Sequence, residues 1–164
     1  MRIIERLIPE HIRNTFYLRY FGLTKIPLLF YVRPSVVEKT EERVVIKIPL
    51  SRRSKNHQGS MYFAALAIGA DCSVGLLAVE LINRQKDSIS FIFKDFYADF
   101  YKRATADVFF SCDQGREIAE LVKKATLSTQ RVEMPLNAIA TVPAENNEAV
   151  ARFRLTLSLK RSDS

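Results

Sequence analysis

The residues of this chain that could do chemistry gather in a short polar loop and in the apolar segment that follows it. The loop contains Asn56 and His57 and ends in Gly59 and Ser60, and the apolar segment contains Asp71. A histidine titrates near neutral pH and can act as a general acid or base. A carboxylate among apolar residues loses hydration, so its pKa is expected to rise toward the range that a base working near neutrality needs.

The segment 61–82 is predicted to form one long helix because it is rich in Ala and Leu and carries Asp71 and Glu80 as its charged residues. It is apolar around nearly its whole circumference, so it must be buried by a sheet or by a partner subunit. The polar loop directly precedes it. We therefore expect any chemistry to take place at the N-terminal end of this helix.

The segments around the long helix alternate apolar and polar residues at the spacing of strands. Two strands are predicted before it, over 32–38 and 43–50, with a turn over 39–42. Four more are predicted after it, around residues 89–93, 106–112, 132–142 and 150–159. A short helix over 117–125 is expected among these four. Pro135 indicates an edge or a bulge in its strand.

The first 24 residues are predicted to be a helical lead-in of one or two short helices. Pro9 is expected to open the second of them and Gly22 to end it. The segment 25–31 is apolar and interrupted by proline, which predicts a packed connection to the first strand.

The order of these elements predicts an α+β fold in which about six antiparallel strands curl around the long helix. The sequence has 164 residues without a repeat or a linker, so 1–164 is expected to be a single domain with a frayed tail at 161–164.

Composition narrows the class of protein. The formal net charge of +7 suits an anionic ligand such as coenzyme A, nucleic acid or acidic lipid, without choosing among them. Cys72 and Cys112 lack metal-ligand spacing and indicate buried free thiols in a reducing compartment, so no metal is expected. The first residues do not have the pattern of a signal peptide, and a cytoplasmic location is predicted. Segment 61–82 is long enough to span a bilayer, but Asp71 near its centre argues against a membrane.

Two segments carry a resemblance to a known family. Residues 56–66 read Asn-His-Gln-Gly-Ser-Met-Tyr-Phe-Ala-Ala-Leu, and residues 95–104, expected between two strands, read Asp-Phe-Tyr-Ala-Asp-Phe-Tyr-Lys-Arg-Ala. With them, the chain from Pro27 to Lys160 resembles the hotdog-fold superfamily, and within it the thioesterase-like branch related to phenylacetyl-CoA thioesterase. The resemblance implies the hotdog fold, in which a sheet wraps one central helix.

The resemblance also implies where a substrate binds. The family places the thioester carbonyl of acyl-CoA at the N-terminus of the long helix, where free N–H groups and the positive end of the helix dipole can stabilise an oxyanion. Gly59 would allow the ligand to approach the backbone closely. Ser60 takes the second position, where many members have another glycine, and its plainer role is that of a helix N-cap.

The related thioesterases carry an Asp or Glu on the long helix, as base or nucleophile, usually seven residues after the second glycine. This chain has Ala67 at that position, which is a departure from the family. Asp71 lies one turn further along the same helical face and is the candidate base. Its alternative role is that of a structural acid, paired with an arginine or hydrogen-bonded to backbone across a dimer interface.

The remaining candidate residues flank the glycine or lie further along the chain. In the family an Asn of this loop polarises the thioester or positions water, and a His stands immediately before the glycine pair, where this chain has Gln58. Asn56 and His57 are therefore candidates, with a turn-forming Asn and a surface His as the plainer interpretations. Lys102 and Arg103 would lie near the phosphates of coenzyme A, which they suit chemically.

The function implied by the resemblance is hydrolysis of an acyl-CoA or acyl-carrier thioester at the interface of a homodimer, with a tetramer as a further assembly. Coenzyme A is then part of the substrate, and no metal or redox cofactor is expected. A module of the same fold that binds acyl-CoA without hydrolysing it stays open, because of Ala67. So does a hydratase or dehydratase using Asp71 with His57. A nucleic-acid or regulatory role is not expected, because the N-terminal helices carry many apolar residues and look packed.

Overall fold

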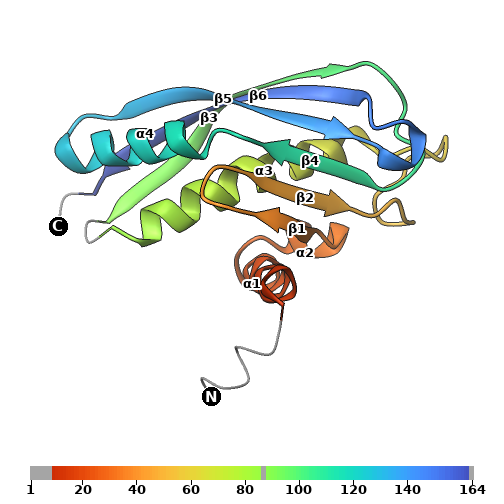
Figure 1. The fold of residues 1–164 in the computed structure, drawn as a ribbon, viewed down its shortest axis with the longest axis horizontal. Coiled ribbons are helices and arrows are strands. Elements are labelled where there is room, and N and C mark those ends of the chain that lie inside the picture. The colour runs from red at the N-terminus through yellow and green to blue at the C-terminus, as the bar shows by residue number, and fades with distance from the viewer. Residues whose placement is uncertain (1–8, 86–87, 163–164) are drawn as a thin grey trace.

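The computed structural model describes residues 9–85 and 88–162, which form one antiparallel sheet and the helices that pack on it (Figure 1). The helices are α1 (Glu10–Lys25), α2 (Pro27–Val32), α3 (Phe63–Asn83), α4 (Gly115–Leu127) and the short 3₁₀ helix η2 (Pro143–Glu145). The strands are β1 (Ser35–Lys39), β2 (Val44–Ile48), β3 (Ile89–Phe100), β4 (Val108–Cys112), β5 (Val132–Thr141) and β6 (Ala149–Arg161). The predicted α+β fold with six antiparallel strands is confirmed.

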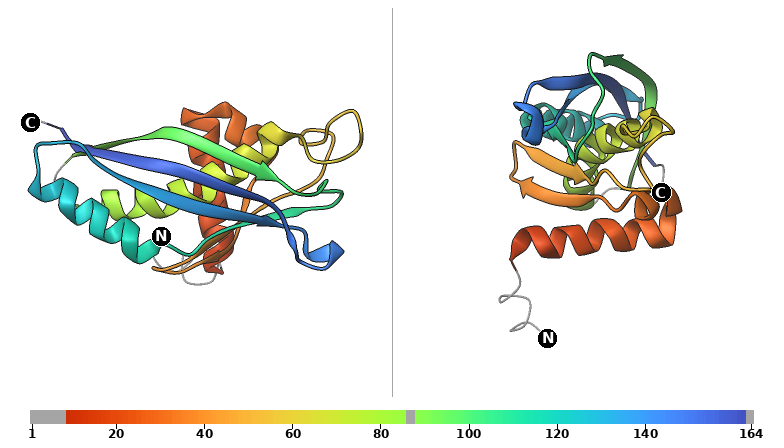
Figure 2. Two further views of the ribbon diagram at one scale, coloured as in Figure 1. Left: turned by 90° about the horizontal axis from the view of Figure 1, so that it is seen from above. Right: turned by 90° about the vertical axis from the view of Figure 1, so that its right-hand side faces the viewer.

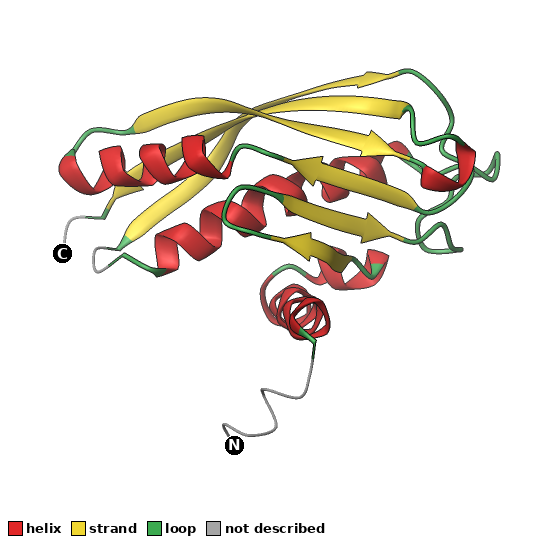
Figure 3. Cartoon of the chain, viewed as in Figure 1, coloured by secondary structure: helices red, strands yellow, loops and turns green. Residues whose placement is uncertain are grey.

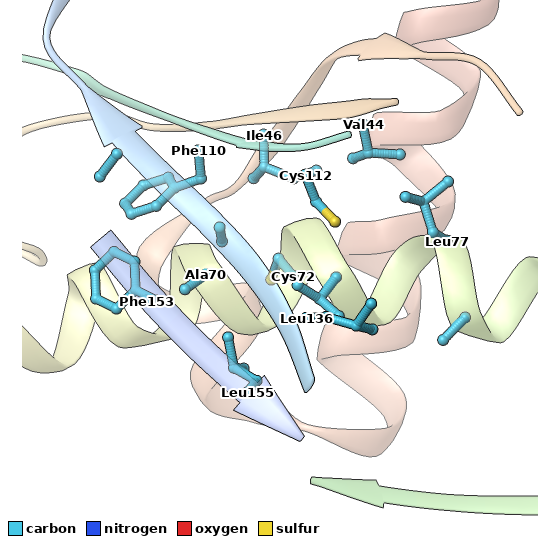
Figure 4. Close-up of a cluster of buried hydrophobic side chains, with 14 of the residues drawn as sticks. Val44, Ile46, Ala70, Cys72, Leu77, Phe110, Cys112, Leu136, Phe153 and Leu155 are labelled. Atoms are coloured by element: carbon cyan, nitrogen blue, oxygen red, sulfur yellow. The ribbon is translucent and has the colours of Figure 1, made fainter. Parts of the chain in front are cut away.

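The strands follow one another across the sheet in the order β1-β2-β4-β5-β6-β3, so that β1 and β3 form its two edges (Figure 3). One row of register partners crosses four strands and is buried throughout: Ile46, Phe110, Ala140 and Ala151. The alternation read from the sequence thus selects the face that meets the helices. In Figure 4, Phe110 and Phe153 of this face lie near Ala70 of α3.

Helix α3 is the predicted central helix, and the sheet curls over it in all three views (Figures 1 and 2). It begins at Phe63 and ends at Asn83, close to the predicted limits of 61 and 82. Among the described helices, α3 is the one that is long and apolar enough to cross a membrane. Of the 18-residue stretch that meets this criterion, 56% is buried inside the fold. Burial under a sheet explains its composition.

The N-terminal helices differ from the prediction. Residues 1–8, and with them the first expected helix, lie outside the described residues. Helix α1 starts after Pro9 as predicted but runs through Gly22, and the expected connection is the helix α2, with Pro27 in its first turn. Gly22 was expected to end α1; instead it lets α2 approach, because a Cβ there would lie 2.8 Å from the backbone N of Phe30.

Helix α1 lies beneath β1, as the right-hand view of Figure 2 shows. The side chain of Thr15 accepts a hydrogen bond from the N–H of Val36 at 2.9 Å, and Arg19 Nε donates to the carbonyl of Pro34 at 2.9 Å. These bonds attach the hairpin of α1 and α2 to the edge of the sheet. This places the hairpin beside the open side of α3.

Two further predictions need correction, both at the long edge strand β3. The segment 95–104 was expected between strands, but its first half continues β3 and pairs with β6, so that Phe96 faces Leu155. The tail was expected to fray from 161, but Arg161 pairs with Ile89 in the same ladder. Both errors arise because a long partner strand extends pairing beyond the residues that alternate clearly. Residues 163–164 lie outside the described residues.

Candidate active site

Asn56 holds the loop between β2 and α3 in shape. Its Oδ1 accepts hydrogen bonds from the N–H groups of Gln58 at 2.9 Å and Ser60 at 3.2 Å, and its Nδ2 donates to Ser60 Oγ at 3.1 Å. The N–H of Asn56 also donates to the carbonyl of Ser60 at 2.8 Å. Asn56 therefore has the turn-forming role in this chain, and an action on a substrate stays a prediction.

Gly59 is an open point of this loop. Its φ of 83° lies in the left-handed region that glycine adopts without strain, and a Cβ built on it would meet no described atom within 4 Å. His57 is exposed, whereas Ser60 is buried beneath the loop. A ligand can thus approach the backbone at Gly59 from solvent, with His57 beside it.

The N-terminus of α3 follows directly. Its N-cap is Tyr62, so the N-cap role considered for Ser60 is wrong. The reason is that Met61 and Tyr62 are still extended, donating their N–H groups to the carbonyls of Ala104 and Ser54, each at 2.8 Å. In the described part of the chain no acceptor meets the N–H groups of Phe63 and Ala64, the first two residues of the helix. These donors are available to a ligand oxygen.

The predicted phosphate-binding residues lie next to this helix end. The hydrogen bond from Met61 to the carbonyl of Ala104 fastens the loop between β3 and β4 to the start of α3. Lys102 and Arg103 precede Ala104 in that loop, and both are exposed. Lys102 forms an ion pair with Glu148. The structure therefore brings Lys102 and Arg103 to the same end of the molecule as the glycine loop.

Asp71 lies elsewhere, on the third turn of α3. It is partly buried, and this burial raises the pKa of its carboxyl to about 6. Among the described residues, no arginine or backbone donor is hydrogen-bonded to it, so the structural pairing considered for Asp71 is not made within this chain. A carboxylate with a raised pKa and no partner is suited to take a proton near neutral pH.

A cavity of about 410 Å³ opens beside Asp71. Its walls come from α1, α2, α3 and β3, and they are apolar apart from Asp71, which is the charged group among the residues described as lining it. Phe91 and Phe93 of β3 form one side, and Tyr17 and Phe21 of α1 form the other. This cavity is suited to bind an apolar group, with one carboxyl group in its wall.

The candidate residues thus fall into two groups. Asn56, His57, Gly59, Ser60, Lys102 and Arg103 gather at the start of α3, whereas Asp71 belongs to the cavity, and none of the loop residues lines that cavity. Asp71 is eight residues after Phe63, which corresponds to about 12 Å along the helix axis. One carbonyl group cannot contact both groups within one chain.

The walls that α1 and α2 contribute were missed from the sequence, which was interpreted there as a packed lead-in. The signal lies in the spacing: Tyr17 and Phe21 are four residues apart beside the buried Leu18 and Gly22, so the helix has more apolar surface than one packed face requires.

The cysteines are buried and free. Burial raises the pKa of the Cys112 thiol to about 11 and that of the Cys72 thiol further, so neither sulfur is a ready nucleophile. The described residues contain no group of three His, Cys, Asp or Glu side chains that could hold a metal ion.

A family model for a domain of unknown function, DUF4442, matches residues 17–159. The chain belongs to this family. A comparison with curated protein sequences gives no match. The matched range includes the glycine loop, Asp71, the cavity walls of α1 and α2, and Lys102 with Arg103, so both groups of candidate residues lie within the family's domain.

Solved structures share the fold. A protein of unknown function from Chlorobaculum tepidum superposes with a TM-score of 0.78 at 9% identity, covering 93% of this chain and 97% of that one. A Pseudomonas aeruginosa protein described as a probable thioesterase gives 0.71 at 23% identity, covering 90% and 96%. Zebra fish thioesterase superfamily member 2 gives 0.65 at 13%, covering 92% and 99%. The predicted resemblance to the hotdog fold is confirmed.

Proposed function

We propose that this chain is an acyl-CoA thioesterase that works as a homodimer. The observation that carries the proposal is Asp71, a partly buried carboxyl whose pKa is raised to about 6 and which lines an apolar cavity of about 410 Å³. A general base for thioester hydrolysis needs a pKa near the working pH and a place for the acyl group beside it. Two of the three structural neighbours reported above are a probable thioesterase and a thioesterase superfamily member, which supports the same chemistry.

The need for a second copy follows from the separation of the two groups of residues. Asp71 lies about 12 Å along the axis from the first residue of α3, so the helix start of the same chain cannot hold the oxygen of a carbonyl that Asp71 serves. In the proposed dimer the helix start of one subunit meets the cavity of the other. Strand β3 offers the surface for this contact, because it is a long edge strand with half-exposed Ile92, Phe96 and Phe100.

The proposed reaction uses water as the nucleophile. The carboxylate of Asp71 takes a proton from a water molecule while the water oxygen attacks the thioester carbonyl carbon. The N–H groups of Phe63 and Ala64 donate to the resulting oxyanion, and Gly59 lets the carbonyl come close. The tetrahedral intermediate then collapses with breakage of the carbon–sulfur bond, and the sulfur leaves with the proton that Asp71 holds. His57 can orient the water or the carbonyl from the exposed side of the loop.

Coenzyme A fits the charges at the helix start. Arg103 and Lys102 are exposed there and can meet its phosphates, and a carrier protein with the same phosphopantetheine arm is the other thiol that would fit. Both are cytoplasmic substrates, in keeping with the predicted location. A tetramer would be a further assembly of such dimers.

A second candidate is a module that binds acyl-CoA without hydrolysing it. It is favoured by Ala67, which stands where related thioesterases carry their acid. In that case the cavity and the basic loop would act as they do in the enzyme, but Asp71 would be a carboxyl that takes no part in proton transfer.

Thiol release from a panel of acyl-CoAs tests these proposals, with size-exclusion chromatography and light scattering on the same samples. The enzyme requires thiol release that falls at least about 100-fold in Asp71→Asn, since a positioned general base contributes about 10²–10⁴-fold. Thermal stabilisation by acyl-CoA without thiol release would favour the binding module. A protein that stays monomeric at the assay concentration and still hydrolyses would contradict the shared site.

A further inference from the structure

The cavity beside Asp71 has a polar end and a direction. Asp71 is the first α3 residue along its wall, Gly75 follows after one turn and Val79 after two. Because the helix rises by about 1.5 Å per residue, Val79 lies about 12 Å from Asp71 along the axis. The wall after Asp71 consists of apolar side chains. A ligand with one polar end therefore has a single favourable orientation, with that end at Asp71.

Gly75 keeps the cavity open next to this polar end. A Cβ atom built on Gly75 would lie 3.7 Å from Oδ1 of Asp71 and 4.0 Å from Cε2 of Phe93, which are ordinary contact distances. Gly75 thus lies between the carboxyl of Asp71 and the ring of Phe93. The atoms near a Cβ at this position belong to side chains and not to backbone, so a side chain here can be accommodated. A larger residue here would extend into the space that a ligand occupies.

The size of the cavity limits the ligand. A cavity of about 150 Å³ is enough to bind benzene, and the cavity beside Asp71 has about 410 Å³. The wall opposite α3 is formed by Tyr17 and Phe21 of α1 and by Leu29 of α2. By the benzene comparison this space would hold roughly sixteen carbon atoms if it were filled, so a flexible chain of roughly ten carbons fits with volume left over.

We propose that α3 measures the length of the acyl chain: the thioester lies at Asp71, and the chain runs past Gly75 toward Val79 beneath the hairpin of α1 and α2. Straight chains of medium length are the substrates of this cavity, and Gly75 and Val79 are its specificity-determining residues. This inference rests on the proposed function for its polar end, but binding of the chain is independent of hydrolysis.

The test uses blocks at two depths. Gly75→Leu obstructs the cavity one turn from Asp71, Val79→Phe obstructs it two turns away, and Gly75→Ala adds a single carbon. Ala119→Leu, at an exposed position of α4 away from the cavity, is the matched control for added bulk. Each variant is assayed with straight-chain acyl-CoAs of four to sixteen carbons, and binding of decanoate and decanoyl-CoA is measured by calorimetry.

We expect the wild type and Ala119→Leu to prefer chains of about ten carbons. Each methylene excluded from the cavity should cost about fourfold in kcat/KM. The leucine side chain of Gly75→Leu takes the place of about three methylenes, so it should lower the ratio of ten-carbon to four-carbon rates by about 60-fold. Val79→Phe should leave the six-carbon substrate unaffected and reduce only longer ones. Gly75→Ala should shift the profile least.

The outcomes separate this inference from the proposed function. If no thiol is released but decanoate binding is lost in Gly75→Leu and retained in Ala119→Leu, the enzyme is refuted and the chain site stands. If hydrolysis occurs and all variants share one length profile, the enzyme stands and the measuring role of α3 is refuted. Should Gly75→Leu fail to fold, Val79→Phe with an unchanged profile would refute it equally.

Discussion

A Cβ atom placed on Gly69 of α3 would lie 2.3 Å from Cε2 of Phe110 in β4. The Phe110 ring is fully buried between the sheet and the helix, where Figure 4 shows it beside Phe153. The absence of a side chain at Gly69 therefore sets how closely α3 lies under the sheet. Asp71 is two residues further on, so this contact also fixes the position of the candidate base.

Gly69→Ala should destabilise the fold by about 2–3 kcal/mol, because the new methyl group forces the Phe110 ring or the helix to move in a tightly packed core. Gly75→Ala is the matched control in the same helix. Its Cβ meets ordinary contacts, so the better helix propensity of alanine should leave stability unchanged or raise it by up to about 1 kcal/mol. Urea denaturation of both variants measures the difference, and equal stabilities would contradict the close approach.

The pH dependence of stability should report the burial of Asp71. Its pKa is about 6 in the folded chain and 3.8 ordinarily, so the folded state favours the protonated form. The wild type should therefore lose stability as the pH rises from about 4 to about 6, by about 3 kcal/mol in total, and change little above that range through this group.

Asp71→Asn removes the titration and should be more stable than the wild type by about 2–3 kcal/mol at pH 8, with the difference disappearing below pH 4. Denaturation at several pH values and one fixed protein concentration checks this, since an oligomer's stability depends on concentration. A difference that grows as the pH falls would mean that Asp71 is stabilised as a carboxylate by a partner.

Much of the fold could be predicted because apolar and polar residues alternate along the strands. Val44, Ile46 and Ile48 have one register in which all are buried, and the largely apolar surface of α3 requires burial. Pro135 was also informative. Strand β4 pairs with β5 at Ile139–Thr141, whereas Pro135 pairs with Thr156 of β6, so in the described sheet Pro135 has a partner strand on one side, as expected of an edge position. These patterns involve residues that are close in the sequence, so they can be interpreted without the structure.

What the sequence did not reveal depends on contacts between distant segments. Gly22 was interpreted as the end of a helix, although its function is to admit α2. Serine is a preferred N-cap residue, which suggested this role for Ser60. Hydrogen bonds to Ala104 and Ser54 hold the next two residues extended, so α3 starts only at Phe63. The cavity of Asp71 could not be seen because α1 and α2 complete it.

The loop geometry predicts a role for Asn56 that is separable from a role in chemistry. Asn56→Ala should remove the bonds to Gln58 and Ser60 and lower stability by about 1–2 kcal/mol. It should also abolish most thioester hydrolysis, because the open backbone at Gly59 would no longer be held. Gln58→Ala is the control, since only the N–H of Gln58 takes part in the loop. An Asn56→Ala protein that is as stable as the wild type would contradict this account.

The exposed charge at Arg103 should contribute to binding rather than to chemistry. Arg103→Ala should raise KM for acyl-CoA about fivefold at low salt, because an exposed ionic contact is worth about 1 kcal/mol, and should leave kcat unchanged. The rise should shrink as salt screens the phosphate contact. Lys123→Ala, at a similarly exposed position of α4, controls for the loss of one positive charge. With an acyl-pantetheine substrate, which lacks the nucleotide, the wild type and Arg103→Ala should have the same KM. A fivefold rise in KM with that substrate would place Arg103 at the acyl end instead.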